Sequence, residues 1–175
     1  PSLFLLHGFG SNMDDLFALN QFFPDDWTII SLQAPISTDF GGWAWAEIDW
    51  NNLKDLPKPE QKYSSREMVI SSINKCINAL KLDTTKVHLI GFSQGAAFTL
   101  YCGLTYPKMF NGLAVLCGFF DYKKVLIEIN TDEIENLNIF VSNGIIDEVI
   151  PIHLGRMTER GLKKLGVKPV YKEYN

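Results

Sequence analysis

The sequence predicts an α/β fold, in which a mostly parallel sheet is covered by helices on both faces. Short apolar runs alternate along the chain with segments whose apolar residues recur at helical spacing, a pattern typical of strand–helix repeats. The runs are continuously apolar, as strands buried on both faces require. With 175 residues, 46% of them hydrophobic, the chain can bury one core. We therefore expect a single domain over residues 1–175.

The first predicted strand, Ser2–Leu6, ends at the glycine-rich turn His7–Gly10. Ser11 and Asn12 are candidate N-caps for the helix that follows. That helix is expected to direct four apolar residues inward: Leu16, Phe17, Leu19 and Phe23. A second strand is predicted over Trp27–Leu32.

The stretch from residue 33 to residue 62 has no regular pattern. Long loops in compact domains are usually functional or disordered, and aromatic residues argue against disorder. This stretch contains Trp43, Trp45 and Trp50, so we expect it to cover something. After it, Ser64–Glu67 matches a capping box that would begin the next helix.

Strand and helix signals continue to alternate through the second half of the chain. The predicted elements are a strand over Lys86–Phe92, a helix over Gln94–Thr105, strands over Gly112–Leu116 and Asn138–Val141, a helix over Pro151–Leu165 and a strand over Lys168–Tyr174.

The segment Gly91–Gly95 matches the nucleophile-elbow pattern G-x-S-x-G. A strand is predicted before it and a helix after it, which is the context that this pattern requires. The glycines leave room where strand and helix approach each other, so the Ser93 hydroxyl is exposed at the edge of the sheet. The N–H of Gln94, at the start of the helix, would face a developing oxyanion.

The loop after the first strand can supply a second oxyanion donor. Gly8 and Gly10 allow the backbone to turn inward, and the N–H of Phe9 is the candidate donor. An acid should follow Ser93 along the chain, and Asp147 lies in the loop after the strand Asn138–Val141. A solvated loop acid or a cap for the next helix is the competing interpretation of Asp147, and Glu148 is a rival on position alone.

Composition excludes several classes of function. The net charge of −4 is mild, which argues against nucleic-acid binding and against a polybasic membrane patch. No apolar run approaches the roughly 20 residues of a membrane span. The odd set of Cys76, Cys102 and Cys117 fits no metal motif, so we expect free thiols, no metal and a cytoplasmic location.

Five segments in order along the chain resemble the phospholipase/carboxylesterase family of α/β-hydrolases, which includes acyl-protein thioesterases and small bacterial esterases. The segments are Leu6–Gly10 with Asp14 and Asp15, Gln33–Pro35, Gly41–Trp45, Gly91–Ala97 and Asn143–Pro151. The resemblance implies an α/β-hydrolase fold with no large lid domain.

The resemblance also assigns roles to individual residues. It implies Ser93 as the nucleophile, Asp147 as the triad acid, and the N–H groups of Phe9 and Gln94 as the oxyanion hole. Trp43 and Trp45 would line the substrate pocket. It further implies a small-molecule ester as substrate, no cofactor, and a homodimer as one candidate assembly.

The catalytic base is the departure from the family pattern, in which a Gly-His pair follows the last strand. His7, His88 and His153 are the histidines of this sequence, and none is well placed. We expect the whole protein to carry the base beyond Asn175 and further strand before Pro1. An ester hydrolase for small to medium acyl groups is the main prediction. The alternatives are a thioesterase or lysophospholipase for longer acyl chains, and an inactive hydrolase-fold binding protein.

Overall fold

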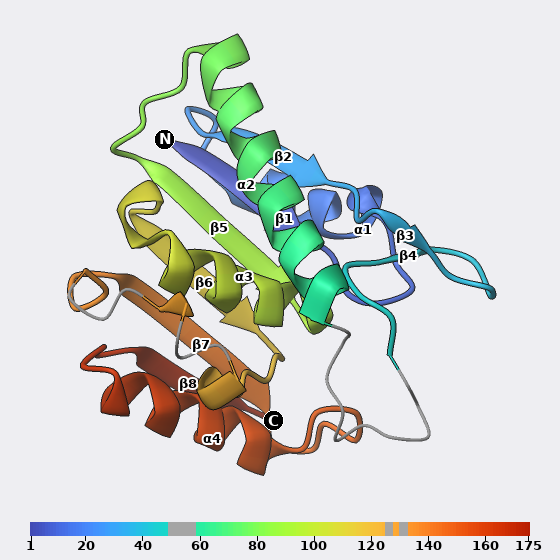
Figure 1. Ribbon diagram of the computed structural model, residues 1–175, viewed down its shortest axis with the longest axis vertical. Helices are drawn as coiled ribbons and strands as arrows, with labels where there is room; N and C mark the ends of the chain where they lie inside the picture. Colours follow the sequence, from blue (N-terminus) through green and yellow to red (C-terminus); the bar gives the residue numbers. More distant parts are fainter. Residues whose placement is uncertain (49–58, 125–127, 130–132) are drawn as a thin grey trace.

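Six parallel strands form one sheet in the order β2-β1-β5-β6-β7-β8 (Figure 1). This computed structural model describes residues 1–48, 59–124, 128–129 and 133–175. The strands of this sheet are β1 (Ser2–Leu6), β2 (Thr28–Leu32), β5 (Val87–Phe92), β6 (Gly112–Leu116), β7 (Asn138–Gly144) and β8 (Val170–Tyr174). A separate hairpin pairs β3 (Ile36–Ser37) with β4 (Trp43–Ala44).

Helices connect the strands of the sheet. The α-helices are α1 (Met13–Phe17), α2 (Pro59–Leu80), α3 (Gln94–Thr105) and α4 (Ile152–Lys164), and the short 3-10 turns are η1 (Ala18–Phe22), η2 (Pro107–Met109) and η3 (Tyr122–Lys124). Each predicted strand and helix is present. The predictions for β1, α3 and β6 match at both ends, and the others differ by a few residues.

One face of the sheet packs against α2, α3 and α4. Its inward side chains include Phe4, Leu89 and Val115, which join Leu100 of α3 and Leu162 of α4 in a single core. Because side chains alternate along a strand, the neighbours of these residues point to the opposite face.

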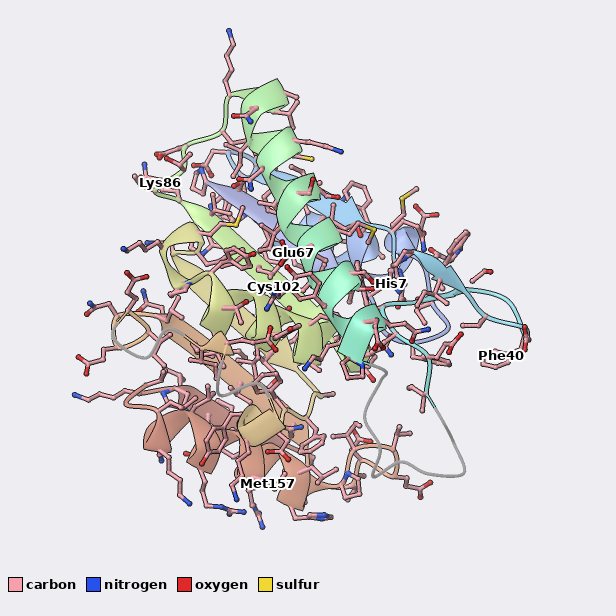
Figure 2. The ribbon with its side chains drawn as sticks, in the orientation of Figure 1. His7, Phe40, Glu67, Lys86, Cys102 and Met157 are labelled. Atoms are coloured by element: carbon pink, nitrogen blue, oxygen red, sulfur yellow. The ribbon has the colours of Figure 1, made fainter. Side chains whose placement is uncertain are left out.

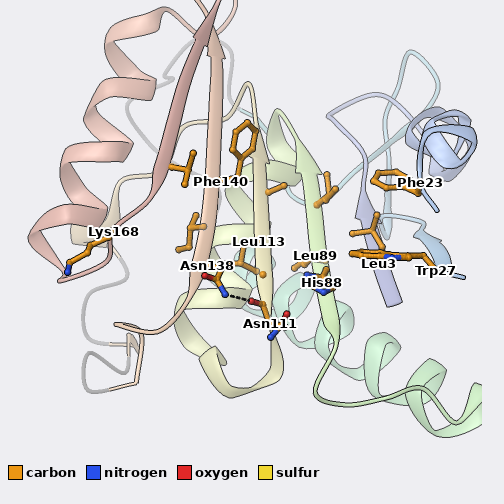
Figure 3. A pocket seen from close by; sticks show the side chains of 15 residues that line it. Leu3, Phe23, Trp27, His88, Leu89, Asn111, Leu113, Asn138, Phe140 and Lys168 are labelled. Carbon is orange, nitrogen blue, oxygen red and sulfur yellow. Dashed lines mark hydrogen bonds between the residues drawn. The ribbon is translucent and has the colours of Figure 1, made fainter. Parts of the chain in front are cut away.

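The opposite face packs against α1 and η1 over β1 and β2, where Leu3, Leu5 and Leu16 form a second core. Helices thus lie on both faces, as predicted. Farther along, an apolar groove of about 420 Å³ runs across β5 to β8, and Ile90, Phe140 and Val170 are among its lining residues (Figure 3).

Two local predictions in the first half of the chain are wrong. Phe17 is 41% exposed, because α1 is only five residues long and the chain tightens into η1 after it. The capping box at Ser64–Glu67 does not begin a helix, since α2 already begins at Pro59. Ser65 instead lies buried inside α2 and donates a hydrogen bond of 2.5 Å to the carbonyl of Trp45.

A buried ionic cluster on α2 holds a later segment of the chain. Arg66 is almost fully buried, and its guanidinium donates to Glu128 at 2.5 Å and stacks on the ring of Tyr101 at 4.6 Å. Tyr101 donates to the same Glu128 carboxylate at 2.6 Å. Burial acts to raise the pKa of Glu128, but the hydrogen bonds from Tyr101 and Arg66 outweigh burial and keep that pKa below its ordinary value.

Among the described residues, no helix combines the length and the apolar character that are needed to cross a membrane. The trio Cys76, Cys102 and Cys117 carries free thiols.

We expect Leu89→Ala to lower the free energy of unfolding by about 2–5 kcal/mol, because Leu89 is fully buried at the centre of the sheet. Urea titration measures the change. Leu80→Ala is the matched control, since Leu80 is 56% exposed at the end of α2. Equal losses in the two variants would contradict the described core.

Candidate active site

Ser93 occupies the tight turn between β5 and α3, with φ of 52° and ψ of −114°. A non-glycine residue with positive φ is strained, at a cost of about 1–3 kcal/mol, and such strain is common at functional sites. The Ser93 N–H is held by the carbonyl of Leu116 in β6 at 2.9 Å. This backbone geometry is the elbow that the sequence predicted.

The steric role predicted for the two elbow glycines is confirmed. A methyl group on Gly91 would lie 2.2 Å from the carbonyl oxygen of Gly95. A methyl group on Gly95 would lie 2.1 Å from the carbonyl oxygen of Leu6 and 2.6 Å from that of His7. The lack of a side chain at Gly91 thus lets α3 pack closely on β5, and the lack of one at Gly95 lets the first turn of α3 approach the end of β1.

The loop after β1 faces the elbow. A methyl group on Gly8 would lie 3.5 Å from Cβ of Ser93 and 3.2 Å from the ring of Phe92. Phe9 follows directly and packs its ring against Phe40, with centroids 5.9 Å apart. The Gln94 amide is the first of α3, and first-turn amides have no partner within a helix. The structure thus brings the segments of both candidate oxyanion donors to the same place.

Trp43 and Trp45 have different surroundings. Trp45 is fully buried, and its indole N–H donates to the carbonyl of His7 at 2.8 Å. Trp43 is 38% exposed in strand β4 of the hairpin, whose outer end carries Phe40 (Figure 2). Only Trp43 of this pair presents its side chain at the surface.

The Gln94 side chain makes contacts that were not predicted from the sequence. Its Oε1 accepts from the N–H of Trp45 at 2.8 Å, and its Nε2 donates to the carbonyl of Ala46 at 2.7 Å. One amide therefore fixes the segment after β4 to the start of α3. The motif indicated only a backbone role for Gln94, because these partners lie 48 and 49 residues away.

Asp147 lies in the loop after β7, at the same carboxyl edge of the sheet as Ser93. Its Oδ1 accepts from the N–H groups of Val149 and Ile150, each at 2.8 Å. These bonds fix the carboxylate in one orientation within its loop. Asp147 does not cap the following helix, because the N-cap position of α4 is Pro151 and receives no side-chain hydrogen bond. Glu148, the rival on position, is exposed.

The end of β6 lies between the strand that precedes Ser93 and the strand that precedes Asp147. Cys117 has φ of 50° and donates its N–H to the carbonyl of Ser142 at 2.8 Å. Burial raises the pKa of its thiol, and the charge of nearby Asp147 raises it further. No role was predicted from the sequence for Cys117 or Asn143. The side-chain amide of Asn143 donates to the carbonyl of Gly118 at 3.2 Å.

The three histidines are placed in different parts of the molecule. His7 is fully buried at the end of β1. His88 packs on Trp27 beside the groove on the sheet's opposite face (Figure 3), with centroids 5.0 Å apart. It lies five positions before Ser93 along the chain, which corresponds to about 16 Å of strand. His153 is exposed on α4. Across the described ranges, no group of three or more potential metal ligands is close enough to hold an ion.

A strained serine between strand and helix, at the carboxyl edge of a parallel sheet and facing a glycine loop, defines an α/β-hydrolase. A family model described as Phospholipase/Carboxylesterase matches residues 1–175. The chain belongs to the phospholipase/carboxylesterase family, and ester hydrolysis is its reaction class.

Relatives in sequence agree with this family. A probable carboxylesterase, SOBER1-like, from Arabidopsis thaliana is 27% identical over 183 residues, which cover 97% of this chain and 68% of that protein. An acyl-protein thioesterase 1 from Debaryomyces hansenii is 28% identical over 127 residues, which cover 69% of this chain and 55% of that protein. The chain thus spans about two thirds of the plant relative and about half of the yeast one.

Solved structures share the fold. The Bacillus cereus carboxylesterase superposes with a TM-score of 0.86 at 16% identity, covering 100% of this chain and 79% of that chain. SOBER1 from Arabidopsis thaliana gives a TM-score of 0.80 at 23% identity, covering 99% of this chain and 87% of that chain.

We expect Gly95→Ala to destabilise the protein by about 1–3 kcal/mol, because the added methyl group would meet the backbone of Leu6. Thermal unfolding measures the change. Gly144→Ala is the control, since the nearest atom to its methyl group would be 3.5 Å away. Wild-type stability of Gly95→Ala would contradict the close approach.

Proposed function

We propose that Ser93 is the nucleophile of a serine carboxylesterase that works through an acyl-enzyme. The observation that carries the proposal is the left-handed backbone of Ser93 with the Gly8 loop packed against it. The Ser93 oxygen attacks the ester carbonyl carbon and its proton passes to a base. The alcohol then leaves with that proton, and water hydrolyses the acyl-enzyme.

The N–H groups of Phe9 and Gln94 are the proposed oxyanion donors. The elbow and the loop after β1 meet at Ser93, so both amides belong to segments next to the reacting carbon. Each donor of this kind is worth roughly 3–4 kcal/mol in a comparable enzyme.

Asp147 is the proposed acid of the triad. Its Oδ1 is held by two backbone N–H groups, which orients the carboxylate to accept from the imidazole of a base. The base is proposed to be a histidine outside residues 1–175, because His7 is buried with both ring nitrogens hydrogen-bonded and His88 lies on the groove side of β5. Residues 1–175 would then form one hydrolase domain of the whole protein.

Esters of small to medium acyl groups are the proposed substrates, with Trp43 lining the pocket and Trp45 supporting it from behind. Trp43, Phe40 and Phe92 are exposed aromatic residues. Phe92 directly precedes Ser93, and the ring of Phe40 packs on Phe9. Aromatic surface suits an apolar acyl or alcohol group. A thioesterase for longer acyl chains is the second candidate, favoured by the yeast relatives named acyl-protein thioesterase 1.

A cytoplasmic location is proposed from the free thiols, which suit a reducing compartment. A homodimer is the proposed assembly, supported by the exposed apolar side chains of Ile146 and Val149 beside Asp147.

We expect Ser93→Ala to abolish hydrolysis of a chromogenic ester and labelling by a fluorophosphonate in the full-length protein. Asp147→Asn should lower kcat by about 10²- to 10⁴-fold, whereas its neighbour Glu148→Gln should stay within about threefold of wild type. Failure of the fluorophosphonate to label wild-type Ser93 would support an inactive binding protein. Equal losses at Asp147 and Glu148 would contradict the assignment of the acid.

Across a series of esters of increasing acyl length, we expect the enzyme to have its highest kcat/KM for small to medium acyl groups. The reason is that the proposed pocket residue, Trp43, lies in a short surface hairpin. Oxygen esters and thioesters of matched acyl length are compared with the same enzyme. A steep preference for long-chain thioesters would overturn the main proposal in favour of the thioesterase.

A further inference from the structure

The ring of His7 is held in a single tautomer. Its Nδ1 lies 2.8 Å from the carbonyl oxygen of Gly8, which can only accept, so Nδ1 carries the proton. Its Nε2 lies 3.2 Å from the N–H of Ala34, which can only donate, so Nε2 is the acceptor. Burial lowers the pKa of His7, although the bond to Gly8 and the charge of Asp15 oppose this shift. The ring is therefore neutral, with Nδ1 as its donor.

The donor bond from His7 determines the direction of the next amide. The carbonyl of Gly8 and the N–H of Phe9 belong to one planar peptide unit, in which the two groups point in opposite directions. When Nδ1 of His7 holds the Gly8 oxygen, it also aims the Phe9 N–H. The N–H of Ser11 contacts the same oxygen at 3.3 Å, so the histidine makes the shorter of these two bonds.

The preceding peptide is also held. The carbonyl of His7 accepts from the indole N–H of Trp45 at 2.8 Å, and it lies against Gly95 with no room for a methyl group. Trp45 is itself fixed at its backbone N–H by Oε1 of Gln94. Gln94, which would supply one oxyanion donor, thus supports through Trp45 the loop of Phe9, which would supply the other.

We propose that His7 is a positioning residue for ester hydrolysis, which orients the Gly8–Phe9 peptide so that the Phe9 N–H points at the oxyanion. The inference rests on the proposed role of that N–H. Packing alone does not require a histidine here, because an apolar side chain would fill a fully buried site without polar atoms to satisfy.

Two substitutions in the full-length enzyme separate orientation from packing. In His7→Asn the amide nitrogen takes the place of Nδ1 and keeps the donor to Gly8, but the acceptor for Ala34 is lost. In His7→Gln the longer side chain reaches the place of Nε2 and keeps that acceptor, but Gly8 loses its donor. Each variant loses one hydrogen bond, so the two should lose similar stability.

We expect His7→Asn to keep kcat within about fivefold of wild type and His7→Gln to lose about 10- to 100-fold, less than the loss of a whole oxyanion donor. KM should stay within about threefold in both variants, because the hydrogen bond from the Phe9 N–H to the oxyanion forms in the transition state. Inhibition by an aryl boronic acid, which forms a tetrahedral adduct, should weaken in parallel with kcat/KM. Thermal unfolding of both variants serves as the stability control.

Equal loss of kcat in the two variants, a loss of kcat that follows Tm, or wild-type kcat in His7→Gln would overturn the proposal.

Trp45→Phe provides an independent variant if His7→Gln does not fold. It removes the hydrogen bond to the His7 carbonyl and should lower kcat by about 3- to 10-fold at unchanged KM. Wild-type kcat in Trp45→Phe would count against the inference. Ser93→Ala is measured alongside. If Ser93→Ala retains activity, the proposed function itself is refuted. If Ser93→Ala is inactive while His7→Asn and His7→Gln have the same kcat, only the role of His7 is refuted.

Discussion

The close approach of the first turn of α3 to the end of β1 is the constraint on which the site depends. The carbonyls of Leu6 and His7 lie where any side chain at Gly95 would be. This contact places the Ser93 turn directly beside the Gly8 loop, where a methyl group added to Gly8 would lie 3.5 Å from the serine Cβ. Strain at Ser93 is tolerated because the flanking strand and helix are both fixed by the core.

A second layer of buried polar contacts surrounds that approach. His7, Trp45 and Gln94 each use a side-chain polar group to hold backbone from a distant part of the chain. Buried polar groups are stable only when they are paired, so these side chains depend on one another and form one unit. The unit connects the end of β1, the segment after β4 and the start of α3 through hydrogen bonds, which is the kind of support that a preorganised oxyanion site needs.

The sequence predicted the order of the strands and helices of the main sheet and located most of their ends to within a few residues, because apolar runs and helical spacing are local signals. It did not predict the β3–β4 hairpin. It failed where tertiary contacts override such signals. Ser64 matches the cap position of a capping box, yet α2 begins five residues earlier and the next residue, Ser65, bonds to Trp45 from inside the helix. Phe17 has helical spacing, yet α1 ends too early to bury it. The ionic cluster of Arg66 and Glu128 had no signal in the sequence, since its partners are 62 residues apart.

The sequence by itself determined the fold class, the elbow around Ser93 and the family, because each depends on residue types at short, fixed spacing. Only the tertiary structure decided that Trp45 is buried while Trp43 is exposed, and that His7 supports the loop through a fixed tautomer. The direction of a side chain and the partner of a buried nitrogen depend on which distant segments meet, and local spacing carries no information about that meeting. The elbow is a local motif, whereas the support beneath it is a property of the folded chain.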